Sequence, residues 1–314
     1  MWYTFLINEA GCLKGHDLNH KVLIIKLGYS ETLTPEITEE VSLGDVLRST
    51  ALLHLYRYDR VTWLTDSTAV PILFGIPNVE VLPYNLTNIL RVREEEFDIV
   101  INLEKVPGIC ALADQVKAWQ RYGFRFDAKT GRTEAYLQSA EALYIASNVE
   151  RKKANSKHWL ELLYEMVGAK WNGELYVLGS YASGQDKYDV GLNYRAGRKF
   201  QNKAWSNHYW SELEDILTLK YHQRACFQPQ ESGLYDYMEW VSSCNTLISN
   251  DSLGLHLAIA MNKNVVGLFG PTPCREMPPY KKGSWIQRDV IDNIVTEDVE
   301  RCLLSRGLLQ EESK

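Results

Sequence analysis

The feature that most constrains the fold is a regular alternation of short apolar runs with helical stretches. Residues 21–27, 61–64, 79–82 and 98–103 have the apolar character of buried strands, and residues 46–56 carry apolar side chains at helical spacing. Strands that alternate with helices form a mostly parallel, doubly wound sheet. The sequence therefore predicts an α/β protein.

The alternation is interrupted once and then starts again. Residues 172–187, rich in glycine, serine and tyrosine, separate the two series and are interpreted as a crossing between domains. The predicted strands of the second series are residues 189–193, 225–227, 245–248 and 265–269. We expect two Rossmann-like domains, 1–171 and 188–314, that face each other across a cleft. Ligands of such sheets bind beyond the carboxyl ends of the strands.

Size and composition narrow the function. A chain of 314 residues can bury two cores, and a formal net charge of −6 argues against a nucleic-acid-binding protein, which is normally basic. No window approaches the roughly 20 apolar residues of a membrane span, and the first residues lack the features of a signal peptide. The six cysteines show no paired spacing. We expect a cytoplasmic protein with reduced thiols, no transmembrane segment and no nucleic-acid partner.

Three potential metal ligands lie near the amino terminus. Cys12, His16 and His20 are spaced four residues apart within the polar leader 1–20. Gly15 disfavours a helix there, and a zinc site would need a fourth ligand, which is not evident. We interpret the segment as a leader before the first strand and predict no metal site.

The run 249–258 joins an apolar strand to an apolar helix through small polar residues. The N–H groups and positive dipole at such a helix start suit a phosphate, and Asp251 and His256 add orientation. A second strand, 265–269, ends in the small-residue loop 270–272. Two such strand ends side by side predict the nucleotide pocket of a sugar-nucleotide enzyme.

Asp45 lies in the first turn of a predicted helix behind the first strand, with Ser42 as its cap. One interpretation is structural, because an acid stabilises a helix start. The other is a general base at the cleft mouth. The helix dipole keeps this carboxyl ionised, which suits a hydroxyl that loses its proton late, when its bond to an oxocarbenium-like sugar is already forming.

Charged residues follow two further strands. Arg198, Lys199 and Lys203 form either a solvated loop or a site that neutralises a diphosphate leaving group. Glu104 and Lys105 form either a local salt bridge or contacts to an acceptor. No Walker-type motif follows these cations and no Gly-x-Gly-x-x-Gly follows the first strand, so ATP hydrolysis and hydride transfer are unsupported.

Five segments in order, 23–27, 42–50, 203–205, 250–258 and 268–272, resemble glycosyltransferase family 9, the ADP-heptose:lipopolysaccharide heptosyltransferases and their relatives. The likeness covers about residues 21–305. It implies a GT-B fold with an N-terminal acceptor domain and a C-terminal nucleotide-sugar domain. It also implies an inverting, metal-independent transfer with ADP-heptose as co-substrate and no other cofactor. In that fold the closing helix often returns to the first domain, which we expect of residues 296–309.

The resemblance assigns roles position by position. Asp45 matches the family's catalytic base. The residues matched to the donor site are Lys203, Asp251, Ser252, Gly254, His256 and Thr272. Among them, Lys203 meets the donor phosphates, and Asp251 and His256 face the donor sugar and diphosphate.

The chain departs from the family pattern at several positions. Residues 28–41, with four acids, are inserted before the motif of Asp45 and would overhang the acceptor side. Asn250 and Leu253 stand where glycine is usual, and residues 200–201 replace a common Trp-Pro pair. The donor nucleotide therefore stays open, as does the acceptor, which can be lipid-linked, a glycan, a protein or a small molecule. A lipid-linked acceptor would add a peripheral membrane contact.

Two other functions fit the same residues. A nucleotide-sugar 2-epimerase shares the two-domain architecture and converts its donor without any acceptor. A non-catalytic nucleotide-sugar-binding subunit would keep the donor turn but would not need Asp45. The motif at 42–45 favours glycosyl transfer over both.

Overall fold

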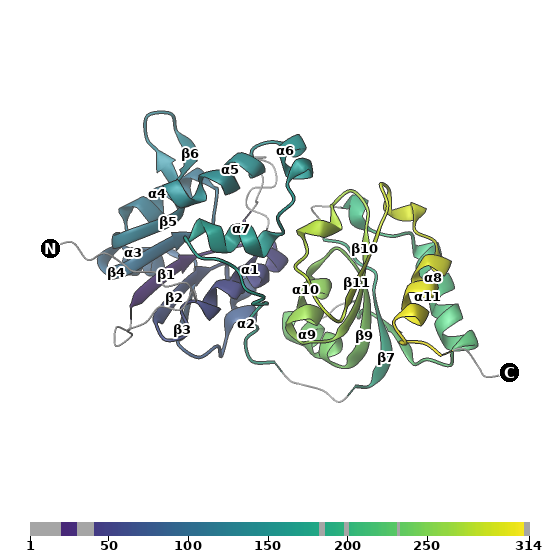
Figure 1. Cartoon of the computed structure of the whole chain (residues 1–314). Helices are drawn as coiled ribbons and strands as arrows, with labels where there is room; N and C mark the ends of the chain where they lie inside the picture. The colour runs from purple at the N-terminus through teal and green to yellow at the C-terminus, as the bar shows by residue number, and fades with distance from the viewer. Residues whose placement is uncertain (1–19, 30–40, 182–185, 198–200, 231–232, 311–314) are drawn as a thin grey trace.

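The computed structural model describes residues 20–29, 41–181, 186–197, 201–230 and 233–310. They form two α/β domains that lie side by side (Figure 1). Each domain is built around its own sheet, of six strands in the first and five in the second. The predicted pair of doubly wound, mostly parallel sheets is confirmed.

The first sheet has the strand order β3-β2-β1-β4-β5-β6, and all of its pairs are parallel except β5–β6. Its strands are β1 (Lys21–Ile25), β2 (Arg60–Thr65), β3 (Val79–Pro83), β4 (Glu96–Asn102), β5 (Lys117–Asp127) and β6 (Arg132–Ala135). Its helices are α1 (Leu43–Ser49), α2 (Val70–Leu73), α3 (Leu86–Glu94), α4 (Pro107–Gln115), α5 (Ala140–Ala146), α6 (Val149–Ala154) and α7 (Trp159–Met166). The short helix η2 (Thr50–His54) continues α1.

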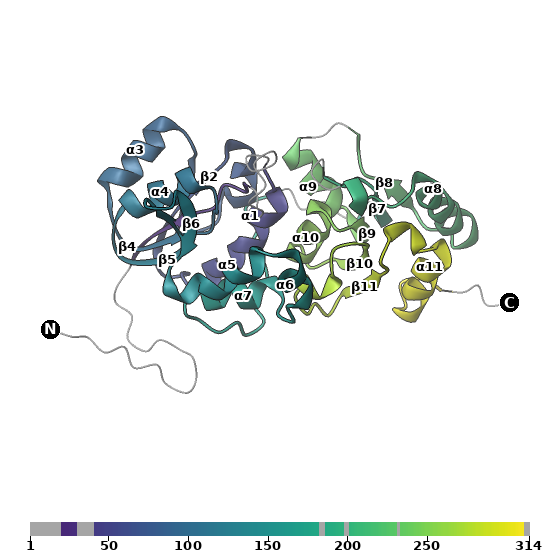
Figure 2. The ribbon, with the colours of Figure 1, turned by 90° about the horizontal axis from the view of Figure 1, so that it is seen from above.

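Both faces of the first sheet are covered, which explains the unbroken apolar runs. Val22 and Ile24 of β1 point into the core shared with α1 and α7, whereas Leu23 and Ile25 point into the core shared with α3 and α4. Seen from above, α5 and α7 lie on one side of this sheet and α3 and α4 on the other (Figure 2).

The second sheet has the order β11-β10-β9-β7-β8 and is parallel throughout. Its strands are β7 (Tyr188–Asn193), β8 (Ala225–Phe227), β9 (Cys244–Asn250), β10 (Asn264–Phe269) and β11 (Gly283–Gln287). Its helices are α8 (Asn207–Asp215), α9 (Leu234–Ser242), α10 (Leu253–Ala260) and α11 (Thr296–Ser305).

The last helix stays with the second domain. Val299 and Leu303 of α11 are fully buried in the core that contains Leu192 of β7 and Leu268 of β10. The helix packs on α8, β10 and β11. The expected return of residues 296–309 to the first domain is therefore wrong, because the apolar face of this helix is already buried against its own sheet.

Three strands were not predicted. The helix α4 ends at Gln115, and the chain continues as β5, which pairs with the short edge strand β6. β11 forms the other unpredicted strand, at the edge of the second sheet. β6 and β11 are edge strands, and most residues of β5 are half-buried or exposed, so all three lack the continuous apolar signal of a strand that is buried on both faces.

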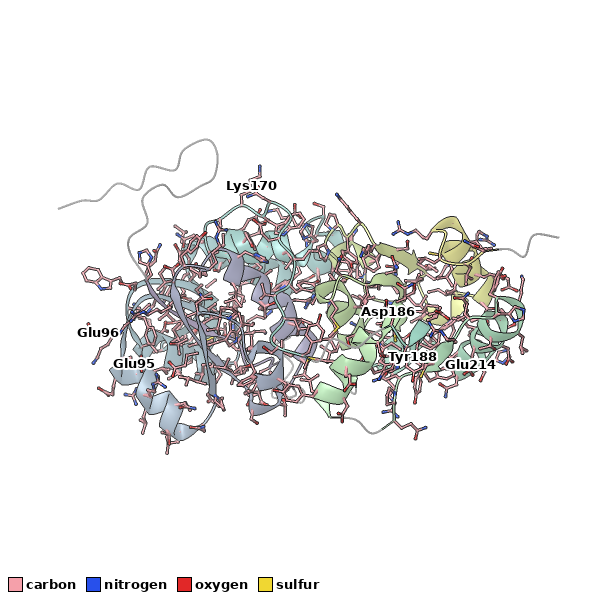
Figure 3. The ribbon with its side chains drawn as sticks, turned by 90° about the horizontal axis from the view of Figure 1, so that it is seen from below. Glu95, Glu96, Lys170, Asp186, Tyr188 and Glu214 are labelled. Atoms are coloured by element: carbon pink, nitrogen blue, oxygen red, sulfur yellow. The ribbon has the colours of Figure 1, made fainter. Side chains whose placement is uncertain are left out.

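The carboxyl ends of the first sheet point toward the second domain. Glu96, the first residue of β4, lies at the end of the first domain that is remote from the second (Figure 3). At the opposite end, α1 packs directly on α10. The start of α1 therefore meets the start of α10, where a Cβ atom at Gly44 would lie 4.0 Å from Leu253 Cα.

Candidate active site

Asp45 sits in the first turn of α1 and forms an ion pair with Arg48, one turn later on the same helix. Burial alone would raise the pKa of the carboxyl, but the positive charges of Arg48 and Lys26 and hydrogen bonds from Arg48 and Ser42 hold it well below its usual range. The guanidinium of Arg48 is itself held over the ring of Trp159, 5.3 Å from the ring centroid. Asp45 is thus an ionised, oriented carboxylate at the domain interface.

The side chains of Lys203 and Asp251, which are 48 residues apart in the sequence, are in contact within the second domain. The ammonium nitrogen of Lys203 lies 2.5 Å from Oδ2 of Asp251. Burial raises the pKa of Asp251, but Lys203 outweighs that effect by charge and hydrogen bond, so that the pKa is lowered. The structure therefore brings two of the predicted donor residues into one ion pair beside the start of α10.

Asn250 joins the two loops that carry this pair. Its side-chain oxygen accepts a hydrogen bond from the backbone N–H of Trp205 at 3.3 Å, and its amide donates to the carbonyl of Tyr194 at 2.6 Å. A glycine could make neither bond. Asn250, which the sequence marked only as a departure, ties the end of β9 to the loops that flank Lys203.

The start of α10 is held by a buried network. Asn193, at the end of β7, donates to Ser252 Oγ at 2.8 Å and accepts from the hydroxyl of Tyr237 at 2.6 Å. The Ser252 side chain makes no hydrogen bond that caps the helix. A Cβ atom at Gly254 would lie 2.6 Å from Asn193 Nδ2. The network explains why glycine is needed at 254 and holds the helix start in place.

His256 connects this helix to the first domain. Its Nδ1 lies 3.3 Å from the hydroxyl of Tyr176, and its ring meets that tyrosine edge to face. A Cβ atom at Gly44 would lie 3.3 Å from His256 Cδ2, so α1 approaches α10 at this point. Burial lowers the pKa of His256 to about 3, and the imidazole is therefore neutral at neutral pH.

A cavity of about 200 Å³ lies between α1 and the second domain. The residues that line it are Leu43, Arg195, Gln228, Pro229, Gln230, Leu234, Tyr237 and Leu253. Arg195 donates to the carbonyl of Gln230 at 2.5 Å and to the hydroxyl of Tyr194 at 3.1 Å. Arg195 is a charged lining residue that sequence reasoning missed, although it belongs to the same loop as the predicted cations. Arg198 and Lys199 lie outside the described residues.

Thr272 belongs to the loop after β10, at the same edge of the second sheet. The side chain of Gln287 holds this loop, because its amide donates to the carbonyl of Gly270 at 2.6 Å and its oxygen accepts from the N–H of Cys274 at 2.7 Å. Thr272 is not among the residues that line the 200 Å³ cavity.

Glu104 and Lys105 do not have the predicted role. Glu104 is fully buried, and its Oε1 accepts hydrogen bonds from the backbone N–H groups of Leu27 and Gly28, each at 2.8 Å. Its cationic partner is Lys26, at 3.2 Å, and not the adjacent lysine. Lys105 is 4% exposed, with its ammonium 5.5 Å from the ring centroid of Phe124. Both the acceptor contact and the local salt bridge are wrong, because these side chains turn into the first domain.

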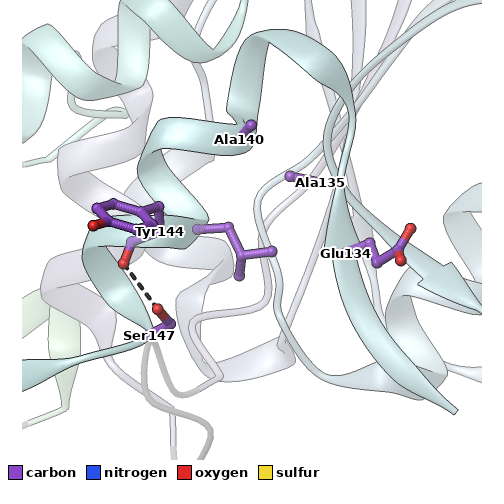
Figure 4. A pocket seen from close by; sticks show the side chains of 6 residues that line it. Glu134, Ala135, Ala140, Tyr144 and Ser147 are labelled. Atoms are coloured by element: carbon purple, nitrogen blue, oxygen red, sulfur yellow. Dashed lines mark hydrogen bonds between the residues drawn. The ribbon is translucent and has the colours of Figure 1, made fainter. Parts of the chain in front are cut away.

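A larger cavity, of about 430 Å³, lies in the first domain between β6 and α5 (Figure 4). Glu134 and Ala135 line one side, and Ala140, Leu143, Tyr144 and Ser147 line the other. The guanidinium of Arg151 lies 3.7 Å from the ring centroid of Tyr144. None of the predicted donor residues lines this cavity.

The described residues contain no cluster of three or more histidine, cysteine or acidic side chains placed to hold a metal ion. His20 bonds to Asp59, with Nδ1 3.1 Å from Oδ1, while Cys12 and His16 lie outside the described residues. Within the same part of the chain, no helix is long and apolar enough to cross a membrane.

Comparison with known proteins points to one family. A family model described as glycosyltransferase family 9 (heptosyltransferase) matches residues 231–293, which contain β9, α10, β10 and β11. The chain is 24% identical over 261 residues to lipopolysaccharide heptosyltransferase 2 of Escherichia coli K12. The aligned region covers 78% of this chain and 67% of that protein.

Solved structures give the fold. E. coli heptosyltransferase WaaC with ADP superposes with a TM-score of 0.62 at 15% identity, covering 91% of this chain and 99% of that one. A family 9 glycosyl transferase from Veillonella parvula superposes with a TM-score of 0.64 at 14% identity, covering 91% and 96%. These likenesses confirm the GT-B arrangement predicted from the sequence.

Proposed function

We propose that the chain is a glycosyltransferase of family 9, which transfers a heptose from ADP-heptose to an acceptor hydroxyl in the assembly of lipopolysaccharide or a related surface glycan. Two observations support this donor: a relative of the chain is a lipopolysaccharide heptosyltransferase, and a neighbour in fold is described with ADP. The observation that carries the proposal is the packing of α1 on α10, which places Asp45 opposite the helix start that follows Asp251.

In this reaction the acceptor oxygen attacks the anomeric carbon while the bond from that carbon to the diphosphate oxygen breaks. Asp45 takes the hydroxyl proton, and the nucleotide diphosphate leaves with the bonding electrons. Because the attacking oxygen enters opposite the leaving group, the configuration inverts. The low pKa of Asp45 makes it a weak base, which fits proton transfer late in the reaction, when the hydroxyl has become strongly acidic.

The donor side supplies positive charge for the leaving group. Lys203 is held next to Asp251 by a 2.5 Å contact, and Arg195 lines the cavity beside Leu253 at the start of α10. Cations together with the N-terminus of a helix stabilise the charge that develops on a departing diphosphate. We therefore propose that these cations neutralise the phosphates.

The acceptor side belongs to the first domain, which contributes Asp45. We place the saccharide part of the acceptor in the 430 Å³ cavity between β6 and α5, where the exposed ring of Tyr144 and the hydroxyl of Ser147 offer an apolar surface and a polar group. The neighbouring helix α6 approaches the donor domain, since Lys152 Nζ lies 3.8 Å from Glu276 Oε1.

Replacing Asp45 by asparagine tests the proposal. Transfer from ADP-heptose should fall by about 10²- to 10⁴-fold in kcat, while the dissociation constant for ADP changes by less than about twofold, because the described hydrogen bonds and ion pair of the Asp45 side chain go to Arg48 and Ser42. The matched control is Asp98→Asn, at the amino end of the same sheet, where Asp98 accepts from the N–H of Lys21. Full transfer activity in the Asp45 variant would disprove its role as the base.

The same assay separates the rival functions. Incubation with ADP-heptose alone should leave the donor intact apart from slow hydrolysis. An isomerised nucleotide sugar in that sample would identify a 2-epimerase. Donor binding without any turnover, over a panel of saccharide acceptors, would identify a binding subunit.

A further inference from the structure

The first domain contains a buried ion pair, Lys26 with Glu104, near Asp45, and neither residue is among those that line the cavity of 200 Å³. Glu104 lies two residues after the end of β4, and Lys26 is the first residue after β1. Their side chains are 0% and 1% exposed. Removing two charges from water costs several kcal/mol per ion, and apolar replacements are often as stable. Stability alone is therefore a weak reason for this pair.

The contacts of Glu104 lead toward the start of α1. Its Oε1 accepts from the N–H groups of Leu27 and Gly28 and lies 3.2 Å from Lys26 Nζ. Its second oxygen is buried and has no hydrogen-bond partner among the described residues. The described hydrogen bonding of the carboxylate is thus directed at the turn that ends β1.

That turn carries the first residues of α1. The carbonyl of Gly28 accepts a hydrogen bond from the N–H of Ser42 at 2.5 Å, and the carbonyl of Ser42 accepts from the N–H of Asp45 at 3.1 Å. Gly28 has a φ of +87°, and a Cβ atom there would lie 2.8 Å from the carbonyl oxygen of Ser42. The position of Asp45 therefore depends on the backbone at Gly28, which Glu104 holds.

We propose that Glu104 and Lys26 are positioning residues for Asp45: they fix the Gly28 turn on which the first turn of α1 rests, and Lys26 adds a positive charge beside the carboxylate. The inference rests on the proposed role of Asp45 as the base. It predicts that the pair affects the catalytic step and leaves donor binding unchanged, since the donor residues belong to the other domain.

Two variants test the pair. Glu104→Leu removes both the acceptor for the N–H groups of Leu27 and Gly28 and the charge opposite Lys26. Lys26→Met combined with Glu104→Leu removes both charges, so that no buried ion is left without a partner. We measure kcat, the KM for ADP-heptose, the dissociation constant for ADP and the melting temperature. Ser139→Ala is the control, because Ser139 is a buried, hydrogen-bonded residue of the same domain that bonds to Gly123 and Met166.

We expect kcat to fall by about 10- to 100-fold in both variants, the cost of displacing a reacting group by about 1 Å, with donor KM and ADP affinity within about twofold of the parent. The double variant should recover part of the melting temperature that Glu104→Leu loses, yet keep the low kcat. Recovery of kcat together with the melting temperature would overturn the inference and leave the pair with a role in stability alone. If Asp45→Asn is inactive while both pair variants are fully active, positioning fails and the proposed function stands. If Asp45→Asn keeps full transfer activity, the assignment of the base fails, and if the parent protein transfers no heptose from ADP-heptose, the proposed function fails.

Discussion

The neutral state of His256 makes the stability of the protein depend on pH in a way that one substitution can isolate. Burial lowers the pKa of this imidazole to about 3, with further lowering by the charge of Arg48. In the unfolded chain the imidazole has its ordinary pKa of about 6.5. Below that pH the unfolded state binds a proton that the folded state does not, so folding stability is complete above pH 6.5 and is lost as the pH falls.

The size of the effect follows from the two pKa values. Each pH unit between them corresponds to about 1.4 kcal/mol. From pH 7 to pH 5 the free energy of unfolding should fall by about 2 kcal/mol through His256 alone, and by about 4 kcal/mol once the pH reaches 3. Asp45 and Asp251 have lowered pKa values, and the stability they contribute is lost only at more acidic pH. The window from pH 7 to pH 5 is therefore specific to histidine.

Urea unfolding followed by tryptophan fluorescence at pH 7, 6 and 5 provides the measurement, with His256→Gln compared with the parent protein. The variant should be less stable at pH 7 but should lose about 2 kcal/mol less than the parent on going to pH 5. Leu255→Ala, in a fully buried residue of the same helix, should lower stability by a constant amount at every pH. Equal slopes for the parent and His256→Gln would refute a buried, neutral imidazole.

Two further substitutions test the two sides of the site. Gly254→Ala places a methyl group 2.6 Å from Asn193 Nδ2, so the start of α10 should shift and ADP affinity should fall by about tenfold or more. Calorimetry measures the affinity, and an unchanged value would show that the donor does not use this helix start. Tyr144→Ala removes the exposed ring that lines the 430 Å³ cavity, so the acceptor KM should rise by about fivefold or more while the donor KM stays unchanged. Steady-state kinetics measure both constants, and an unchanged acceptor KM would place the acceptor elsewhere.

The inner strands and the donor turn could be predicted because each carries its own local signal. β1 is apolar at every position that faces either core, which only a strand buried on both faces requires. Lys203 and Asp251 each follow a strand end, and parallel strands bring such positions together without further information. Resemblance to a family then supplied roles that the residue types alone left ambiguous.

The missed residues depend on contacts between distant parts of the chain. Asn193 recognises Ser252 and Tyr237 over separations of 59 and 44 residues, so no local pattern marks it. Asn250 looked like the loss of a glycine, yet its side chain holds two loops that only the fold brings near. Glu104 could be identified from the sequence as a charged residue after a strand end, but not the direction of its side chain. That side chain is buried because Lys26 and the backbone N–H of Leu27 bind its carboxylate.

The predicted insertion before Asp45 gives the buried charge of Glu104 a proposed role in fixing the position of the base. Residues 28–41 lengthen the connection between β1 and α1, which by itself would loosen the position of the base. The hydrogen bond from Ser42 to Gly28 brings the two ends of this segment together at one point. Glu104 fixes that point from β4, and α1 consequently starts from the same place whatever lies between. An insertion is compatible with a fixed base because the constraint acts on its ends and not on its length.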